Sequence, residues 1–376
     1  MTTATDGVGL YVHIPFCRRK CNYCDFFSLC SVDLKTVEDY TDAVCREIEG
    51  YREEKKTPVR SIYFGGGTPS LLPSALHAKI HSAIRESFEV LEDAEITLEA
   101  NPGTTDAGML RELRAIGYNR ISFGLQSIHE NELKILGRIH TYEDFLASYA
   151  SAREAGFDNI SVDLMYGIPE GTVESLEKTL RAVTDLSPEH ISLYGLIVEE
   201  GTPFHKMKDN LNLPDVDTEC DMYEMACDYL ARRGYSHYEI SNYARRGYQC
   251  RHNLIYWRDE EYIGVGAAAH SYFKSERYGN SASLDEYFSP EYEKYRCREE
   301  IDGKEEAYEY AMMRLRLAEG ISLSEYRSRF GKDFTEGKEE LIDRLARGGF
   351  VTLSADRLSL TDRGMYVNNY LLTELL

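Results

Sequence analysis

The chain has 376 residues, 43% of them hydrophobic, and it contains no low-complexity stretch. This composition indicates an ordinary folded protein with room for one large domain and a smaller one. The net charge of −21 and the lack of a basic stripe exclude nucleic-acid binding, because phosphates bind clustered Lys and Arg. No apolar run reaches roughly 18 residues and no signal peptide is recognisable, so we expect a cytoplasmic protein without a transmembrane segment; peripheral membrane contact stays open. The odd number of nine cysteines fits a reducing compartment.

The first two hundred residues alternate short apolar runs with amphipathic stretches, which is typical of a β/α architecture with parallel strands. Six such units predict an α/β fold with a partial (β/α)6 barrel. The expected strands are Leu10–Ile14, Ser61–Phe64, Glu95–Leu98, Arg120–Phe123, Ile160–Leu164 and Ile191–Leu196. The expected helices are Val37–Glu53, Ser74–Glu89, Asp106–Ala115, Tyr142–Ala155 and Thr172–Thr184.

Beyond about Gly201 the pattern becomes irregular and rich in tyrosine, with one expected helix at Thr218–Arg232. From about Glu305, three helical stretches precede two short strands, Phe350–Leu353 and Arg357–Leu360. Helices followed by a hairpin predict a small winged-helix-like α+β module, for which we expect an intramolecular or partner contact. The sequence therefore predicts three parts: a barrel at 1–204, an extension of the barrel at 205–304, and the C-terminal module at 305–376.

Cys17, Cys21 and Cys24 stand in the sequence CRRKCNYC, directly after the first expected strand. Three thiolates on one short loop can bind three irons of a [4Fe–4S] cluster and leave the fourth iron open to a small chelating molecule. The spacing therefore predicts a cluster that serves as a reaction centre. A structural zinc site is the alternative, with His13 or Asp25 as its fourth ligand.

Polar residues lie at the carboxyl ends of successive expected strands. In a parallel barrel these ends form one face, where functional groups collect. The glycines of the GGGTP sequence allow close approach of the backbone to a ligand, towards which we expect their N–H groups to point; a tight turn into a helix is the plainer interpretation. The residues on this rim are Cys17, Gly65–Thr68, Glu99, Gln126 and Asp163.

The motifs YVHIPFCRRKCNYC, GGGTPSLL, EANPG, GLQS with LGRIH, and VDLMYGIP together resemble radical S-adenosylmethionine (SAM) proteins of the coproporphyrinogen-oxidase-like group. The resemblance covers about residues 10–375. It implies a partial (β/α)6 barrel, a [4Fe–4S] cluster, and SAM held at the open iron. In this group, reduction of the cluster can cleave SAM to a 5′-deoxyadenosyl radical.

The resemblance also implies roles for individual residues. The three cysteines of the loop match the cluster ligands. Arg138 would clamp the SAM carboxylate, and Asp163 or Glu99 would accept bonds from its ribose or amino group. The positions that match SAM contacts are Tyr11, Tyr23, Gly66, Gly67, Thr68, Glu99, Gln126, Arg138, Asp163 and Ile197.

A second motif, HNLIYW, contains the single tryptophan of the chain and resembles the haem-binding motif of HemW-type haem chaperones. The resemblance implies haem contacts by His252, Asn253, Tyr256 and Trp257, with His252 as the candidate iron ligand. An imidazole can ligate haem iron and aromatic rings can pack on a porphyrin. Cys250 and His270 are further candidate ligands, and Arg251 or Arg258 would pair with propionates. The structural alternative is a loop histidine bonded to backbone, with the two aromatic residues in the core.

The true oxygen-independent coproporphyrinogen oxidases carry a further cysteine two positions after the loop, where this chain has Phe26. Only ten residues precede the first expected strand, whereas those enzymes have a longer N-terminal segment. Both differences favour a haem chaperone over a decarboxylase, and we expect it to deliver haem to acceptor proteins such as those of the respiratory chain. The alternative is an oxygen-independent coproporphyrinogen III oxidase that forms protoporphyrinogen IX with SAM.

Overall fold

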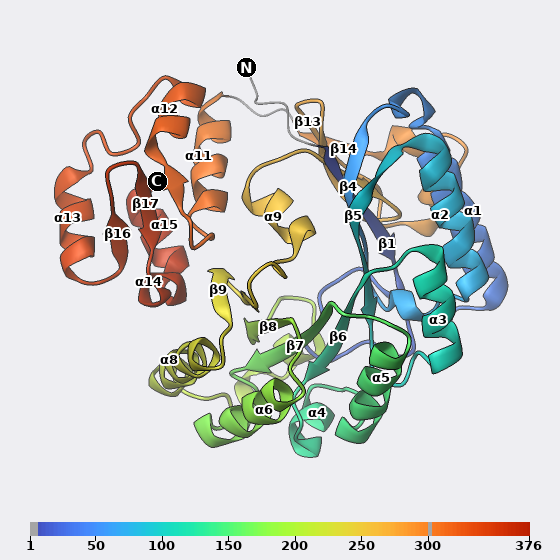
Figure 1. Ribbon diagram of the computed structural model, residues 1–376, viewed down its shortest axis with the longest axis horizontal. Coiled ribbons are helices and arrows are strands. Elements are labelled where there is room, and N and C mark those ends of the chain that lie inside the picture. Colours follow the sequence, from blue (N-terminus) through green and yellow to red (C-terminus); the bar gives the residue numbers. More distant parts are fainter. Residues whose placement is uncertain (1–6, 300–302) are drawn as a thin grey trace.

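The computed structural model describes residues 7–299 and 303–376, and its first half is a curved sheet of parallel strands (Figure 1). The six expected strands are all present and pair side by side in chain order, which confirms the α/β class. The structure lengthens the first, second, fourth and fifth by two to five residues, begins the third six residues earlier than predicted, and places the sixth one residue earlier in the chain. They are β1 (Val8–Ile14), β4 (Pro58–Gly66), β5 (Glu89–Ala100), β6 (Arg120–Gln126), β7 (Ile160–Tyr166) and β8 (His190–Gly195).

The helices that connect these strands cover the convex face of the sheet (Figure 1). Their starts are set by side-chain caps: Asp33, Asp106, Thr141 and Thr172 each accept a hydrogen bond from the backbone N–H three residues later. All five predicted helices are confirmed. They are α1 (Leu34–Glu49), α2 (Ser74–Ser87), α3 (Ala107–Ile116), α5 (Tyr142–Glu154) and α6 (Val173–Asp185), and a short α4 (Glu130–Ile135) lies between α3 and α5.

Side chains of each parallel strand alternate between two environments. Leu10, Val12 and Ile14 of β1 are fully buried in the main hydrophobic core. The intervening residues Tyr11 and His13 lie on the opposite face, because successive side chains of a strand point to opposite sides. The same alternation places polar residues of the other strands on the inner, concave face. These inner residues are Ser61, Tyr63, Glu95, Glu99, Arg120, Ser122, Ser161, Asp163, His190 and Ser192.

The sheet continues beyond the predicted strands on both sides. Among the described residues it has twelve strands, in the order β14-β13-β12-β11-β1-β4-β5-β6-β7-β8-β10-β9. The strand β11 pairs in parallel with β1, and Tyr11 stands opposite both Gly264 and Tyr63. The strands beyond β11 on one side and beyond β8 on the other pair antiparallel with their neighbours. Their bounds are β9 (Ser236–Glu239), β10 (Asn242–Ala244), β11 (Tyr262–Val265), β12 (His270–Phe273), β13 (Glu276–Gly279) and β14 (Cys297–Glu299).

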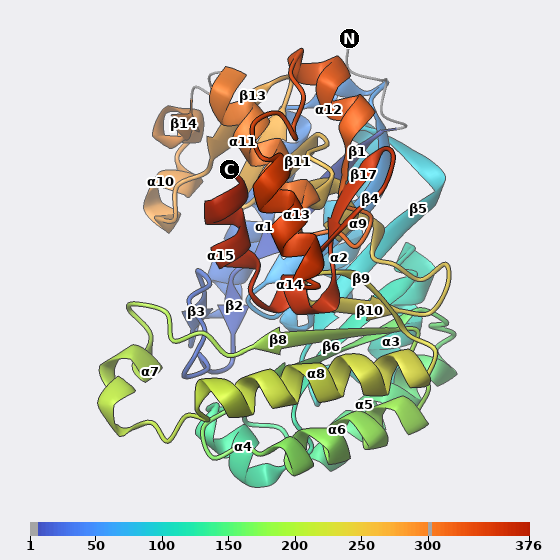
Figure 2. The same ribbon diagram turned by 90° about the vertical axis from the view of Figure 1, so that its left-hand side faces the viewer.

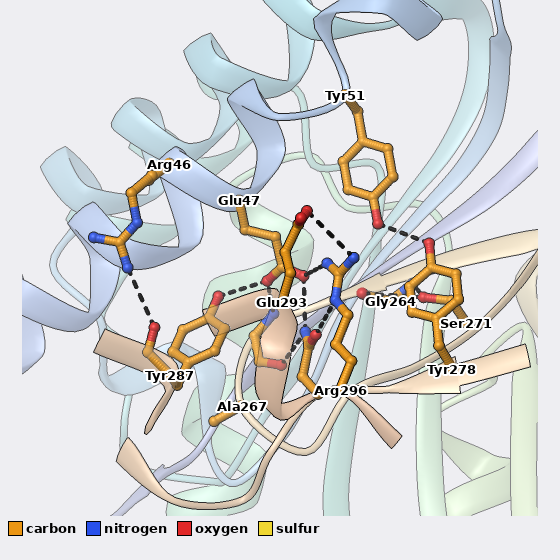
Figure 3. A network of polar contacts seen from close by, with 12 residues as sticks. Arg46, Glu47, Tyr51, Gly264, Ala267, Ser271, Tyr278, Tyr287, Glu293 and Arg296 are labelled. Atoms are coloured by element: carbon orange, nitrogen blue, oxygen red, sulfur yellow. Dashed lines mark hydrogen bonds and ion pairs between the residues drawn. The ribbon is translucent and has the colours of Figure 1, made fainter. Parts of the chain in front are cut away.

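A buried ionic network fastens this added edge to α1 (Figure 3). The carboxylate of Glu47, 1% exposed, accepts hydrogen bonds from Arg296 (2.8 Å), Tyr287 (2.7 Å), Asn280 (2.8 Å) and the backbone N–H of Gly266 (2.9 Å). A buried charge is tolerated because it is paired and its oxygens are saturated with donors. The network fixes the turn that follows β11.

The remaining elements of the first 299 residues lie around the strand ends or on the concave side of the sheet. The predicted helix at 218–232 is confirmed as α8 (Val216–Arg232). The helix α9 (Arg251–Trp257) sits on the concave side, opposite α1 to α3 (Figure 1). No helix in the described part of the chain is long and apolar enough to cross a membrane. The shorter elements are β2 (Phe16–Cys17), β3 (Leu29–Cys30), α7 (Pro203–Lys206) and α10 (Leu284–Phe288).

The C-terminal module has a hydrophobic core of its own, which runs from Tyr310 to Leu375. The predicted helices and hairpin are present, and a third strand, β15, joins β17 to complete a small sheet. The module contacts helix α8 of the barrel part by means of its own helix α14 (Figure 2). The predicted limits of the three domains stay a prediction. Residues 205–299 contribute to the same hydrophobic core as the parallel strands. The elements are α11 (Gly303–Arg314), β15 (Ile321–Ser322), α12 (Leu323–Phe330), α13 (Glu339–Arg347), β16 (Val351–Leu353), β17 (Arg357–Leu360), α14 (Asp362–Tyr366) and α15 (Asn368–Leu375).

Candidate functional site

A cavity of about 430 Å³ opens over the carboxyl ends of the parallel strands, and we call it the cysteine pocket. It brings together residues from segments far apart in the sequence, as the barrel rule predicts. Tyr11 is the one predicted member of this group that does not line it. The predicted residues that do are Cys17, Cys21, Cys24, Tyr23, Gly66, Gly67, Thr68, Glu99, Gln126, Arg138, Asp163 and Ile197.

Cys17 ends β2, and Cys21 and Cys24 lie on the loop between β2 and β3, which is anchored to the body of the protein. Its central residue Asn22 forms three bonds: its backbone N–H to Leu136 O (2.9 Å), its side-chain amide to Ile135 O (2.8 Å), and its carbonyl accepts from Phe204 (2.9 Å). Tyr23 packs into an apolar cluster with Leu136 and Phe204. The loop is therefore held in place by its own neighbours, with its thiols facing the pocket.

A chain of hydrogen bonds joins two of these thiols through residues of other strands. Thr68 Oγ1 lies 3.5 Å from Cys17 Sγ and accepts from the amide of Asn101 (2.8 Å). Arg138 donates to Asn101 Oδ1 (2.5 Å) and to Cys21 Sγ (3.5 Å). Its guanidinium also donates to Gly124 O, while its Nε has no hydrogen-bond partner among the described residues, so Arg138 braces the cysteine loop and keeps one unused donor.

The donor set fits an iron–sulfur cluster. Burial raises the pKa of Cys17, and it raises the pKa of Cys24 to about 11, so metal binding must displace a proton from each of these thiols. The Arg138 bond to Cys21 is the kind of donor that stabilises a ligated thiolate. His13 is not placed as a fourth ligand, because its two ring nitrogens bond Tyr11 (3.0 Å) and Phe27 O (3.0 Å).

The glycines at the end of β4 are required by close contacts. A Cβ on Gly66 would lie 2.4 Å from the His13 ring, and one on Gly67 would lie 2.7 Å from the backbone of Pro15. The N–H groups of Gly66 and Gly67 donate within the protein, to the carboxylate of Glu99 (3.1 Å) and to Ile14 O (2.8 Å), and their role towards a ligand stays a prediction. The glycines therefore serve tight packing beneath the pocket.

We expect Gly66→Ala to lower the free energy of unfolding by several kcal/mol, because it adds a ring clash to backbone strain of about 1–3 kcal/mol at φ +108°. Urea unfolding followed by circular dichroism measures this. Gly156→Ala is the matched control, since Gly156 has φ +88° but nothing within 4 Å of the added Cβ. Equal losses in the two variants would show that the His13 contact is unimportant.

Two carboxylates from neighbouring strands face the cysteine pocket. Glu99 accepts from Tyr63 (2.8 Å), and Asp163 accepts from Ser122 (3.0 Å). Burial raises the pKa of Asp163 and raises that of Glu99 to about 7. Gln126 enters the same wall with φ 69°, a left-handed conformation that costs energy in a residue other than glycine. Such strain is characteristic of functional sites.

The HNLIYW motif forms helix α9 and packs against the concave face of β1 and β4. His252 is 1% exposed, and its ring nitrogens bond Ser61 (2.9 Å) and Tyr256 (2.8 Å). Its ring stacks on Tyr63 with centroids 5.1 Å apart. The structural alternative of a loop histidine bonded to backbone is wrong, because the motif is helical and the partners are side chains. Iron ligation by His252 requires the hydrogen bond at the ligating nitrogen to be broken, to Ser61 for Nδ1 or to Tyr256 for Nε2.

The other candidate haem-binding residues around the motif also have partners within the protein. Cys250 is fully buried and donates to Glu95 (3.5 Å). Arg251 pairs with Asp93 and Arg258 with Glu319, so neither cation stands free for a propionate. Asn253 is half-buried on the same helix. Trp257 packs with Leu254 and Leu317 beneath the guanidinium of Arg316, 5.4 Å from its ring.

A second cavity of about 270 Å³, which we call the aromatic pocket, lies beside α9. It contains Tyr11 and Tyr256, and it includes His270, whose side chain has no hydrogen bond to any residue that the structure describes. Phe26 is 63% exposed and lines both this cavity and the cysteine pocket. The full lining is Tyr11, His13, Phe26, Phe27, Tyr256, Tyr262, Ala268, Ala269 and His270.

Sequence reasoning missed several residues of these sites. Asn101 lies within the EANPG motif, and its place directly after β5 was the available signal. Tyr63 precedes Gly65 by two residues, so strand alternation assigns both to the inner face. The neighbours Ser122, Met165 and Tyr194 also line the cysteine pocket or bond its carboxylates, and the same alternation places them there.

Comparison with known proteins agrees with this geometry. Residues 11–183 match the Radical SAM superfamily and residues 301–367 match the HemN C-terminal domain. A Bacillus subtilis protein named "Heme chaperone HemW" is 34% identical over 366 residues, which cover 96% of each chain. An Escherichia coli protein of the same name is 34% identical over 371 residues and 97% of each chain.

A solved structure extends the likeness to the fold. Coproporphyrinogen III oxidase (HemN) from Escherichia coli superposes with a TM-score of 0.85 at 24% identity, covering 98% of this chain and 90% of that one. At this identity the match shows a shared fold alone. The sequence relatives share 30–37% identity and, in the two cases above, nearly the full length. The chain therefore belongs to the HemW family within the radical SAM superfamily.

Proposed function

We propose that this protein binds haem and delivers it to acceptor proteins, and that it carries a [4Fe–4S] cluster and SAM in the cysteine pocket. The observation that carries the proposal is the aromatic pocket, which is lined both by Tyr256 of the HNLIYW motif and by the unbonded imidazole of His270. The names of the relatives support it. Thiol ligands that must stay reduced support a cytoplasmic location.

In the cysteine pocket, Cys17, Cys21 and Cys24 would hold the cluster, which supplies an open iron and a reducing electron when bound. Arg138 acts as a positioning residue, because it ties the loop to the ends of β5 and β6. Glu99 and Asp163 present acceptors to the polar groups of SAM. The exposed Ile197 offers an apolar contact at the mouth of the pocket, where we expect the adenine.

We expect SAM affinity to increase as the pH is raised from 6 to 8, with an apparent pKa about 7, because Glu99 must be ionised to pair with a cationic group of SAM. The folded protein holds this proton more tightly than the unfolded chain, whose carboxyl has a pKa near 4.5. The free energy of unfolding should therefore fall as the pH rises from about 4.5 to about 7, and Glu99 should add no further change above that pH. Isothermal titration of cluster-loaded protein at several pH values measures the affinity, and Glu99→Gln should flatten its pH profile. An unchanged profile in the variant would contradict this assignment.

In the aromatic pocket, the rings of Phe26, Phe27 and Tyr256 would pack on the porphyrin, and the imidazole of His270 is free to ligate iron. The ammonium of Lys20 donates to Phe26 O (3.1 Å) and brings a positive charge to this edge for a propionate. His252 would support the site by holding Tyr256. A half-open pocket suits a carrier, because the ligand must leave again.

Haem titration followed at the Soret band tests the proposal. We expect one haem per chain, a weaker and spectrally altered complex for His270→Ala, and weaker binding for Tyr256→Ala. His205→Ala is a matched control from outside the pocket, on α7. If both variants bind haem like the parent, the aromatic pocket is not the haem site. A His252→Ala variant that alone abolishes binding, while keeping its fold, would instead assign iron ligation to His252.

The decarboxylase alternative is tested separately. Cluster-loaded protein is incubated anaerobically with SAM, a reductant and coproporphyrinogen III, and the porphyrin products are oxidised and separated. We expect no protoporphyrinogen IX, because Phe26 replaces the further cysteine of those enzymes. Stoichiometric or faster formation of that product would overturn the chaperone assignment.

A further inference from the structure

Three metal-binding residue types meet where the C-terminal module contacts the barrel. Cys227 comes from α8, His237 from β9 and Asp362 from α14. One donor atom of each lies within 4.8 Å of the other two. Tyr223 of α8 also donates to the carbonyl of Asp362 (3.1 Å), so the two helices are already in contact here. Figure 2 shows α8 and α14 side by side.

His237 is the central member of this group and is not fully satisfied. Its side chain is 8% exposed, and its Nδ1 bonds Asp362 Oδ1 at 2.7 Å. Its Nε2 is buried and has no hydrogen-bond partner among the described residues. The ring is fixed by stacking on Tyr243, with centroids 4.3 Å apart and planes inclined by 10°. A buried imidazole that is held rigidly and has one ring nitrogen without a partner has the properties of a metal ligand.

A cysteine, a histidine and an aspartate can also form a catalytic triad, but this group does not suit one. A nucleophile must be reached by its substrate, and Cys227 is 8% exposed. Its Sγ already forms a hydrogen bond with the hydroxyl of Tyr243 at 3.1 Å. Burial raises the pKa of this thiol to about 11, so without a metal it is protonated.

We propose that Cys227, His237 and Asp362 bind one zinc ion, which joins the C-terminal module to the barrel. A thiolate, an imidazole and a carboxylate are the ligands zinc prefers, and a water completes a tetrahedron. Two ligands of one tetrahedral zinc lie roughly 3–4 Å apart, so the three donors need to shift by about 1 Å or less. The soft thiolate selects zinc over magnesium or calcium.

The protonation balance of this site is simple. Asp362 is ionised, since its bond with His237 keeps the pKa of its carboxyl below the usual value. The imidazole ligates in its neutral form, and the thiol of Cys227 loses its proton to become a ligand. Each zinc bound therefore releases one proton to the solvent, which calorimetry in buffers of different ionisation enthalpy detects.

The test uses full-length protein with its cysteine-loop cluster loaded anaerobically, so that Cys17, Cys21 and Cys24 are occupied. Zinc is titrated against a chromophoric chelator, and cobalt(II) is used to observe the thiolate charge-transfer band. We expect one zinc per chain and a cobalt–thiolate band. Loss of a hydrogen bond that supports a metal ligand usually lowers metal affinity about 10- to 100-fold. We expect a larger loss of zinc affinity for each of the three ligand variants, Cys227→Ser, His237→Gln and Asp362→Asn.

Cys220→Ser is the matched control, because Cys220 lies two turns away on the same helix and should leave both readouts unchanged. Asp362→Asn keeps the shape of an exposed side chain, so its fold is secure even if the buried variants unfold. No zinc in the parent, or equal zinc affinity in the parent and Asp362→Asn, would overturn the proposal. A cobalt spectrum without a thiolate band would do the same.

Discussion

Arg296→Ala should lower the free energy of unfolding by about 3–5 kcal/mol, which is the cost of leaving a buried charge without its partner. Glu47 is 1% exposed and Arg296 is 6% exposed, so no water replaces the lost guanidinium. Arg296 also lies over the rings of Tyr278 (4.8 Å) and Tyr292 (5.1 Å), and these contacts are lost as well. Urea unfolding at neutral pH measures the change.

A comparison with surface charges isolates the effect of burial. Lys294 and Glu291 form an ion pair in the same segment, but both are about two-thirds exposed. Lys294→Ala should cost no more than about 1 kcal/mol. The double variant Glu47→Gln, Arg296→Met should recover part of the loss, since it removes both charges together. A loss below 1 kcal/mol for Arg296→Ala would show that the network in Figure 3 is not important for stability.

Arg296→Ala should also weaken haem binding, because the ionic network around Glu47 holds one wall of the aromatic pocket in place. Glu47 accepts from Gly266, and Tyr40 accepts from Ala267 (3.0 Å) and donates to His13 O (2.7 Å). Ala268 and Ala269 of the same turn line the pocket. A charge pair distant from the ligand therefore sets the position of one wall.

The barrel strands could be predicted because their pattern is local. Each has apolar residues at every second position, as in Leu10, Val12 and Ile14, and each is followed by an amphipathic helix. The strand β11 lacked this signal: it is four residues long, and it gains its place by pairing with β1, which is over 240 residues away. Pairing between such distant segments produces no periodic hydrophobic pattern in the local sequence.

The sequence was sufficient to predict which residues belong to the sites in many cases, but not the conformation of those residues. The spacing of Cys17, Cys21 and Cys24 depends on one loop, so three neighbouring positions carry the whole signal. The burial of His252 depends on Ser61 and Tyr63 from another strand, which no local pattern reports. For the same reason Tyr11 was assigned to the cysteine pocket but lines the aromatic pocket.

The two pockets are connected through a short series of side chains. The ring of Tyr63 stacks on His252 on one side, and its hydroxyl donates to Glu99 on the other. Phe26 lines both cavities. A displacement of α9 would therefore reach the carboxylate in the cysteine pocket through one aromatic ring. This arrangement places a continuous series of contacts between the two pockets.

Asn101→Ala should reduce the stability of the iron–sulfur cluster by about 10- to 100-fold, the usual cost of losing a hydrogen bond that supports a metal ligand. Asn101 is the shared partner of Thr68 and Arg138, which contact Cys17 and Cys21 respectively. Removing its side-chain amide breaks the hydrogen bonds to Thr68 and to Arg138 together. The rate of iron loss to a ferrous chelator, followed anaerobically by the cluster absorption, measures this.

Asn131→Ala is the control, since Asn131 is exposed on α4 and should lose iron at the parental rate. Asn101→Asp distinguishes the two bonds: its carboxylate still accepts from Arg138 but no longer donates to Thr68. We expect it to lie between the parent and Asn101→Ala. If Asn101→Ala releases iron as slowly as the parent, the three thiols hold the cluster by themselves, and the hydrogen-bond chain serves the fold of the loop before the metal arrives.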